Sequence, residues 1–306
     1  MKFWVGVTDN RWYEFLAQRR LDEVNFWQPS ATPPFKGAPV GMPFLFKLKR
    51  PNNHIAGGGF FVTYSTLPVP LAWEIFGEKN GAAALDEFFA LLGPLASGRG
   101  LSGAIGCTVL TNPFFLPAER WVEPPGWAPN IVRGKMYETS LDDGSALWAA
   151  VARSLSQERA QVMTPEGISE EEAKYGPAVL VSPRLGQASF RVLITDAYKR
   201  RCAITGESTL IALEAAHIVP YAHEGTHDVR NGLLLRADFH RLYDAGLVSV
   251  TPGLRIKISP RIHEAYFNGK AYYRMNDASL TQIPDRPEQR PDPDRLNWHY
   301  KNCFQA

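Results

Sequence analysis

The sequence has few features that would tie it to a membrane, an oxidising compartment or a strongly charged partner. Its three cysteines, Cys107, Cys202 and Cys303, are far apart and form no C-x-x-C pair, which argues against a disulfide framework and against structural zinc. No apolar run approaches the roughly 18 residues of a membrane span, and the N-terminus has no signal-peptide core. The net charge of +2 means that any surface for an anionic partner must be local. We therefore expect a cytoplasmic protein that does not enter a membrane.

The composition is that of an ordinary globular protein, with 45% apolar and 21% charged residues among 306, so that two domains are expected. Residues 164–184 are polar and acidic and are interrupted by glycine and proline, which is typical of a linker. A helix with one apolar stripe is predicted before it, through residue 160. We predict an α+β protein with one domain over 1–140, a helical linker over 141–183 and a second domain over 184–306.

The first domain combines strand and helix patterns. Strands are predicted at 2–8, 43–50, 55–68 and 105–117, and a helix at 9–19 that begins with Asp9 as its cap. In residues 43–50, apolar and basic side chains alternate, which predicts a half-buried strand. Two further helices are expected between residues 71 and 93. The pattern indicates a small bent sheet interrupted by helices.

The most informative stretch lies between Cys202 and Val250. It predicts a strand over 211–219, a polar loop, a turn at Asn231-Gly232, a second short strand, and a helix over 237–246. His217, Asn231 and His240 are spaced by fourteen and nine residues within this order. Four of the seven histidines of the chain lie here.

This stretch resembles the HNH nuclease motif, a ββα-metal finger, and in particular the McrA-like restriction type that reads C-x-x-T-G, A-A-H-I, N-G-L-L-L and H-R-x-x-D-x-G. The resemblance implies that His217 is the general base, that Asn231 braces the loop, and that His240 is a metal ligand. An imidazole near its ordinary pKa suits the deprotonation of water at neutral pH. One divalent ion for each site, Mg²⁺ or Mn²⁺, is the expected cofactor, because hard cations stabilise charge on a phosphate.

One position departs from the family pattern. The residue before the general base is usually an Asp or His ligand, and here it is Ala216. Glu214 is the nearest carboxylate, but a regular strand would direct it away from the face of His217, so that a bulge would be needed. Asp244, one helical turn after His240, is a second candidate ligand. The other two histidines of the loop, His223 and His227, are interpreted as solvated loop residues.

A basic segment precedes the motif. Between residues 184 and 201 five basic side chains accompany one acid, which gives a local charge of +4 in a nearly neutral chain. In the nuclease subgroup the corresponding helix lies along the DNA backbone, and contacts of that kind add affinity without sequence information. A solvated helix face is the alternative. The predicted backbone contacts are Arg184, Arg191, Lys199, Arg200 and Arg201.

The first domain is similar to the PUA-like group, which includes the EVE and ASCH domains. The similarity rests on the strand FLFKLKR, the apolar-glycine strand IAGGGFF, the exit NPFFLP, and the proline-spaced Trp121 and Trp127. Such domains hold one flipped nucleobase in an aromatic pocket, so that the resemblance implies a reader of modified bases. Core packing is the alternative for these aromatic residues. The predicted base-binding residues are Trp27, Phe26, Phe35, Asn25, Ser30 and Trp127.

Together, the two resemblances imply a metal-dependent endonuclease that acts on double-stranded DNA carrying a modified cytosine, as modification-dependent restriction enzymes do. A homodimer is expected, since one finger cuts one strand. Two other hypotheses remain open from the sequence. One is a non-catalytic DNA-binding protein with a degenerate HNH fold, and the other is an RNA-directed or non-specific toxin nuclease.

Overall fold

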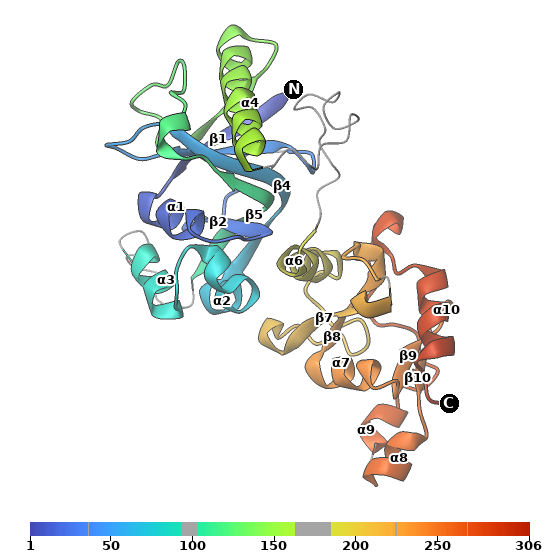
Figure 1. Cartoon of the computed structure of the whole chain (residues 1–306). Coiled ribbons are helices and arrows are strands. Elements are labelled where there is room, and N and C mark those ends of the chain that lie inside the picture. Colours follow the sequence, from blue (N-terminus) through green and yellow to red (C-terminus); the bar gives the residue numbers. More distant parts are fainter. Residues whose placement is uncertain (36, 94–102, 163–184, 224, 268) are drawn as a thin grey trace. The chain divides into compact units, whose positions relative to one another are not determined.

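The computed structural model describes residues 1–35, 37–93, 103–162, 185–223, 225–267 and 269–306. The predicted linker at 164–184, including Arg184, lies outside these residues. The chain divides into two compact units at residues 184 and 185. Each unit combines strands and helices, so that the predicted α+β class is confirmed (Figure 1).

A six-stranded mixed sheet forms the first unit, with the strand order β2-β5-β4-β3-β1-β6. The pair β1–β3 is parallel and the other pairs are antiparallel. The strands predicted at 2–8 and 55–68 are present with the same bounds. Two strands at the edges of the sheet, β2 and β6, were not expected from the sequence. The strands are β1 (Lys2–Thr8), β2 (Glu23–Gln28), β3 (Pro43–Leu48), β4 (Ile55–Pro68), β5 (Ala104–Phe115) and β6 (Gly134–Glu138).

Strand β3 is buried along its whole length, so that the prediction of a half-buried strand is wrong. It lies between β1 and β4 and has packed side chains on both faces. Lys47, only 4% exposed, donates to the Leu48 carbonyl at 3.1 Å and to Asn53 Oδ1 at 3.2 Å. Its ammonium also lies 5.0 Å from the ring centroid of Trp127. These contacts, which the alternation of residue types does not reveal, compensate for the burial of the charge.

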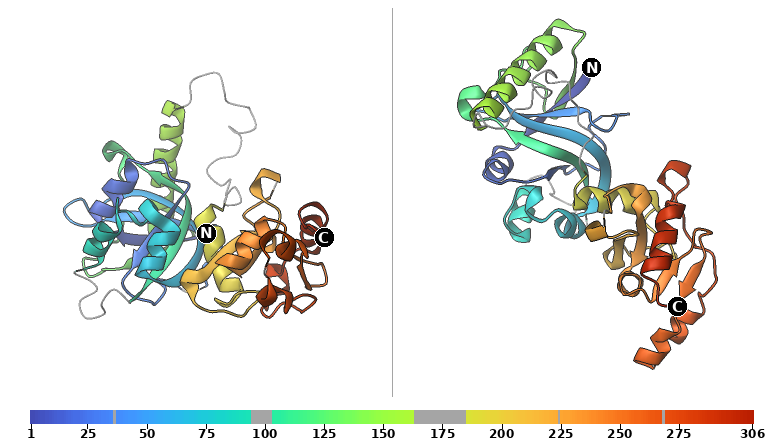
Figure 2. Two further views of the ribbon diagram at one scale, coloured as in Figure 1. Left: turned by 90° about the horizontal axis from the view of Figure 1, so that it is seen from below. Right: turned by 45° about the vertical axis from the view of Figure 1, so that its right-hand side comes forward.

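Helices cover both faces of this sheet (Figures 1 and 2). Trp12 and Leu16 of α1 pack with Phe44 and Phe46 on one face. Alternation along a strand places Leu45 on the other face, where it packs in a second cluster with residues of α4. The helices of this unit are α1 (Asn10–Ala17), α2 (Val69–Phe76), α3 (Leu85–Leu92) and α4 (Asp142–Val162), with short 3-10 turns at Gly77–Asn80 and Ala118–Arg120.

Helix α4 was assigned to the linker by the sequence, and in the structure it packs against the sheet. Its Leu147 and Val151 are 1% and 0% exposed and lie in the same cluster as Phe3 and Tyr137. The apolar stripe predicted for this helix therefore has a partner within the first unit.

The second unit consists of two hairpins and several helices. The pairs β7–β8 and β9–β10 are antiparallel, and α6, α7 and α10 pack beside them. Its elements are α6 (Gln187–Ala197), β7 (Leu213–His217), β8 (Gly232–Arg236), α7 (Ala237–Asp244), β9 (Val248–Val250), β10 (Ile256–Ile258), α8 (Arg261–Tyr266), α9 (Lys270–Tyr273) and α10 (Pro293–Asn302), with 3-10 turns at Leu210–Ala212, Tyr221–His223, Val229–Asn231 and Pro287–Gln289. In the described ranges, no helix has the length and apolar character needed to cross a membrane.

Candidate active site

The three residues of the predicted motif come from the hairpin β7–β8 and from the helix that follows it. His217 ends β7 and is paired with Gly232 at the start of β8, next to Asn231. A Cβ atom on Gly232 would lie 2.3 Å from Ile194 Cδ1 and 2.8 Å from Phe190 Cζ. Glycine at this position therefore lets α6 pack closely against the hairpin.

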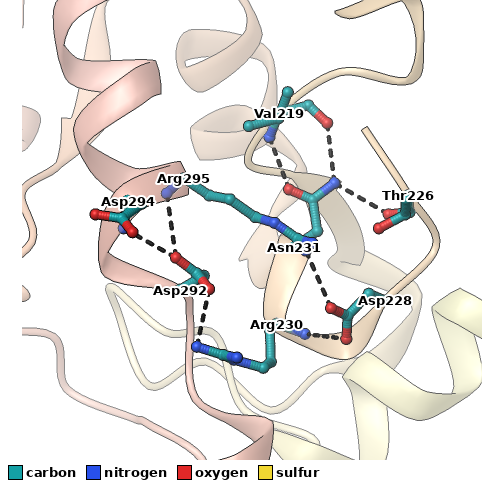
Figure 3. A network of polar contacts seen from close by, with 8 residues as sticks. All are labelled: Val219, Thr226, Asp228, Arg230, Asn231, Asp292, Asp294 and Arg295. Atoms are coloured by element: carbon teal, nitrogen blue, oxygen red, sulfur yellow. Dashed lines mark hydrogen bonds and ion pairs between the residues drawn. The ribbon is translucent and has the colours of Figure 1, made fainter. Parts of the chain in front are cut away.

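Asn231 binds the loop that connects the two strands (Figure 3). It is fully buried, and its Oδ1 accepts a hydrogen bond from the Val219 amide at 2.9 Å. Its Nδ2 donates to the carbonyl oxygens of Val219 at 2.9 Å and Thr226 at 3.0 Å. One amide side chain thus satisfies three backbone groups of the loop.

Two ion pairs connect the same loop to α10, and the sequence did not reveal them. Arg230 Nη2 lies 2.8 Å from Asp292 Oδ2, and Arg295 Nη1 lies 3.2 Å from Asp228 Oδ2. Asp292 also caps α10, because its side chain accepts from the amides of Asp294 and Arg295 (Figure 3). Asn231 therefore connects Val219 and Thr226 of the loop, and the two ion pairs attach Asp228 and Arg230 to the start of α10.

His217 has the environment of an unprotonated histidine. Its ring stacks on Phe190 at a centroid distance of 4.1 Å and an interplanar angle of 11°. Burial, followed by the charges of His227 and His240, lowers the pKa of His217 to about 4. The imidazole is therefore neutral at pH 7 and has a free lone pair for a proton, but it is a weaker base than the imidazole of ordinary pKa expected from the sequence.

His227 is not a solvated loop residue, which corrects the prediction. It is partly buried, and its Nδ1 lies 3.2 Å from Nε2 of His217. His223 differs from it, since it is exposed and its ring lies 5.5 Å from that of Trp298. The prediction of a solvated loop residue therefore fits His223 but not His227.

His240 lies between the two carboxylates that were the alternative metal ligands. Its Nδ1 is 2.6 Å from Glu214 Oε2 and its Nε2 is 3.4 Å from Asp244 Oδ2. Strand β7 pairs with β8 in continuous register from Leu213 to His217, so Glu214 contacts His240 from a strand that has no bulge. Burial raises the pKa of Asp244; His240 opposes this shift and Glu214 adds to it.

The donor types at His240 fit a hard divalent ion, because two carboxylates and one imidazole are present. Their arrangement does not yet form a coordination site. Across the part of the chain that the structure describes, no group of three or more His, Cys, Asp or Glu side chains could hold a metal ion. The imidazole and the carboxylates bind one another, and Ala216 supplies no further ligand.

The predicted DNA-contacting residues do not lie on one helix. Helix α6 ends at Ala197, and Lys199 and Arg200 follow it with left-handed backbone angles, φ 53° and 60°. Lys199 Nζ lies 2.7 Å from Asp285 Oδ2, and Arg200 Nε lies 3.7 Å from Asp196 Oδ1. Arg201 is exposed and Arg191 is partly buried. Part of the predicted charge is thus neutralised by neighbouring acids.

The predicted base-binding residues of the first unit are not all neighbours. Phe26 and Phe35 both pack on Phe44, at centroid distances of 4.7 and 6.2 Å. Trp127 packs in the cluster on the opposite face of the sheet. Asn25 is fully buried and its Nδ2 donates to Asn80 Oδ1 at 2.8 Å, whereas its own Oδ1 has no hydrogen-bond partner among the described residues.

The two remaining members of that set have partners of their own. Trp27 donates from Nε1 to the Asn80 carbonyl at 2.8 Å and meets the edge of Phe88. Ser30 follows β2, and its Oγ accepts from the Thr32 amide at 3.1 Å. Phe26 and Trp27 are consecutive in β2, and both pack against the cluster that contains Trp12 and Phe44.

Three buried polar atoms lie near Phe26 and Phe35, and the sequence patterns did not identify them. Trp4 Nε1, Tyr64 OH and Thr108 Oγ1 are three of six side-chain atoms among the described residues that are buried without a hydrogen-bond partner. Thr108 pairs in register with Phe26 on β2 and with Tyr64 on β4, and Trp4 packs on Phe35 at 5.4 Å. Only strand register brings these residues to one face, since no sequence motif joins them.

A strand, a loop, a second strand and a helix that bring His217, Asn231 and His240 together define a ββα nuclease finger. The match with a known family agrees: residues 202–251 match the HNH endonuclease family. This segment is therefore an HNH endonuclease domain, and the protein is a nuclease. No curated protein matches the chain.

Some solved structures are similar to the chain at low identity. An ASCH protein from Zymomonas mobilis is 8% identical, with a TM-score of 0.33, over 48% of this chain and 94% of its own. A point mutant of that protein, also 8% identical, has a TM-score of 0.35 over 49% of this chain and 99% of its own. The modification-dependent TagI restriction endonuclease is 12% identical, with a TM-score of 0.30, over 96% of this chain and 79% of its own. Similarities at this level carry no functional assignment.

Proposed function

We propose that this protein is a metal-dependent DNA endonuclease that cuts double-stranded DNA containing a modified cytosine. The observation that carries the proposal is the neutral, partly buried His217 at the end of β7, inside the segment that matches the HNH endonucleases. A modified-base reader in the first unit is the finer part of the proposal.

In this mechanism His217 takes a proton from the water that attacks phosphorus. Asn231 keeps the loop closed and so keeps the imidazole in position. His240 would hold Mg²⁺ or Mn²⁺ together with Glu214 or Asp244, after these side chains turn from one another toward the ion. A divalent ion, when bound, supplies neutralising charge at the scissile phosphate and the leaving oxygen.

The reader would use the face of the sheet that carries Phe26 and Phe35. A flipped base that stacks on such aromatic side chains gains about 1–3 kcal/mol, which offsets part of the unstacking cost. Burial raises the pKa of Tyr64, so its hydroxyl stays protonated and can donate a hydrogen bond. Buried polar atoms ordinarily have hydrogen-bond partners. A bound base would supply such partners for Tyr64 OH and Thr108 Oγ1.

The proposal also includes an oligomeric state and a cellular location. One ββα finger cuts one strand, so a double-strand break requires two copies, and we infer a homodimer on DNA. The three cysteines are free, which agrees with a reducing, cytoplasmic location.

The first experiment is cleavage of matched DNAs in Mg²⁺ or Mn²⁺. The DNAs are unmodified or carry methyl-, hydroxymethyl- or glucosyl-hydroxymethyl-cytosine. We expect cutting confined to one modified substrate, and His217→Ala should bind that DNA but not cut it. Equal cutting of all substrates would remove the reader from the proposal, and cutting by His217→Ala would remove the general base.

A second experiment separates base reading from simple packing. Tyr64→Phe and Thr108→Val each remove one polar atom with little change in shape. If these atoms bind the base, both variants lose preference for modified DNA. If they only fill the core, the loss of an unsatisfied polar atom stabilises the fold and leaves the preference intact. Tyr137→Phe is the control for substrate preference, because it removes a hydroxyl from the opposite face; it should lower stability, since that hydroxyl donates to the Pro125 carbonyl at 2.7 Å.

A further inference from the structure

We propose that His227 is a positioning residue for His217 and fixes the tautomer in which His217 acts as a base. This inference rests on the proposed function, in which His217 is the general base. It goes beyond the HNH motif, which contains no role for a histidine at this place in the loop.

The geometry joins the two rings directly. His217 Nε2 and His227 Nδ1 are 3.2 Å apart, and the ring centroids are 5.2 Å apart at an interplanar angle of 60°. Phe190 packs against both rings, stacked on His217 at 4.1 Å and tilted against His227 at 5.7 Å. The pair is therefore held in a partly buried, aromatic environment.

The direction of the hydrogen bond decides which nitrogen is basic. If His217 donates its Nε2–H to His227 Nδ1, then Nδ1 of His217 carries the lone pair that accepts a proton from water. When water gives up its proton, the O–H bond breaks, an N–H bond forms at Nδ1, and hydroxide remains to attack phosphorus. The positive charge on His217 is then stabilised by the acceptor at Nε2. The opposite direction would place a proton on Nδ1 and remove the base.

The loop is built so that His227 faces His217. Asn231 Nδ2 binds the carbonyl of Thr226, the residue before His227, at 3.0 Å. On the other side Asp228 accepts from the amide of Arg230 and from the side chain of Arg295. Gly225, two residues before His227 in the same loop, packs so closely that a Cβ would lie 2.0 Å from the Val219 carbonyl oxygen. These contacts fix the backbone on both sides of His227.

A matched pair of variants tests the proposal. Asn and Leu have the same branched shape, but only Asn places an oxygen near the position of the His Nδ1 atom. His227→Leu should lower kcat by about 10–100-fold with KM unchanged, which is at or below the roughly 100-fold lower limit for a general acid or base, because His227 only positions that group. His227→Asn should stay within about threefold of the native rate, because an acceptor remains. His223→Leu, a change at the exposed histidine of the same loop, is the control.

Two further readouts separate positioning from a structural role. Any residual cleavage left in His217→Ala should not fall further when His227→Leu is added, because the group that His227 positions is already absent. Histidine ¹⁵N spectra of the full-length protein, which need no cleavage, should show the Nε2–H tautomer at His217, and a mixture of tautomers in His227→Leu. This readout remains informative even if no DNA substrate is cut, so that failure of the proposed function is recognised separately. A native rate in His227→Leu, or the Nδ1–H tautomer at His217 in the native protein, would overturn the proposal.

Discussion

Replacement of Asn231 by Asp tests how the loop over the candidate active site is held. The substitution keeps the shape of the side chain and the acceptor for the Val219 amide. It replaces the Nδ2 donor by an oxygen that faces the carbonyl oxygens of Val219 and Thr226, now 2.9 and 3.0 Å from that position. Because Asn231 is fully buried, water cannot take over either of the lost hydrogen bonds without local opening.

The magnitude follows from these contacts. Each lost hydrogen bond is worth about 0.5–1.5 kcal/mol, and the repulsion among three buried oxygens adds to this loss. We expect the loop to open more easily by about 2–4 kcal/mol, which corresponds to about 30–700-fold faster amide exchange at tenfold for each 1.4 kcal/mol. Lowering the pH should reduce the defect, because a protonated Asp regains one donor.

Hydrogen–deuterium exchange of the full-length protein measures this opening. Peptides that cover 218–232 should lose protection, peptides from the first unit should not change, and cleavage should fall in parallel. Asn302→Asp, at an exposed amide near the end of α10, is the control for the added charge. Unchanged protection of 218–232 in Asn231→Asp would refute the bracing function of this residue.

Three further predictions concern the same unit. The pKa of His217 in the folded protein is about 4, below its ordinary value of 6.5, so its contribution to the free energy of unfolding should be complete above pH 6.5 and fall by about 2–3 kcal/mol toward pH 4. Denaturant titrations of the native protein and of His217→Gln measure this difference. The value of kcat/KM should decline near pH 4 and not near pH 6.5. Gly225→Ala should disrupt the loop and lower the melting temperature, whereas Gly253→Ala, whose Cβ would have its nearest neighbour at 3.8 Å, should be tolerated; equal melting curves would contradict the packing argument. Arg201→Gln should weaken DNA binding equally for all sequences and reduce the salt slope by about 1, and an unchanged slope in a filter-binding titration would exclude a phosphate contact.

Local sequence patterns predicted many ends of helices and strands, because interactions between residues close in the chain determine where these elements begin and end. The turn at Asn231-Gly232, the cap at Asp9 and the glycine at 246 mark element ends that the structure contains. The alternation of apolar and polar residues gave a wrong prediction of burial where neighbouring strands cover a strand on both faces. Strand β3 reads as half-buried, but its position between β1 and β4 covers both of its faces, and the burial of Lys47 depends on Trp127, eighty residues later in the chain.

The sequence by itself determined that the chain contains an HNH nuclease motif, because the residue types, their spacing and the surrounding apolar pattern all lie within one continuous segment. It could not determine that His227 faces His217, since a loop of polar residues has no periodicity from which to infer direction. Nor could it predict that Trp4, Tyr64 and Thr108 share a face with Phe26, because strand order and register create that proximity from distant segments. Tertiary structure decided these contacts, as burial and backbone pairing act between residues far apart in the chain.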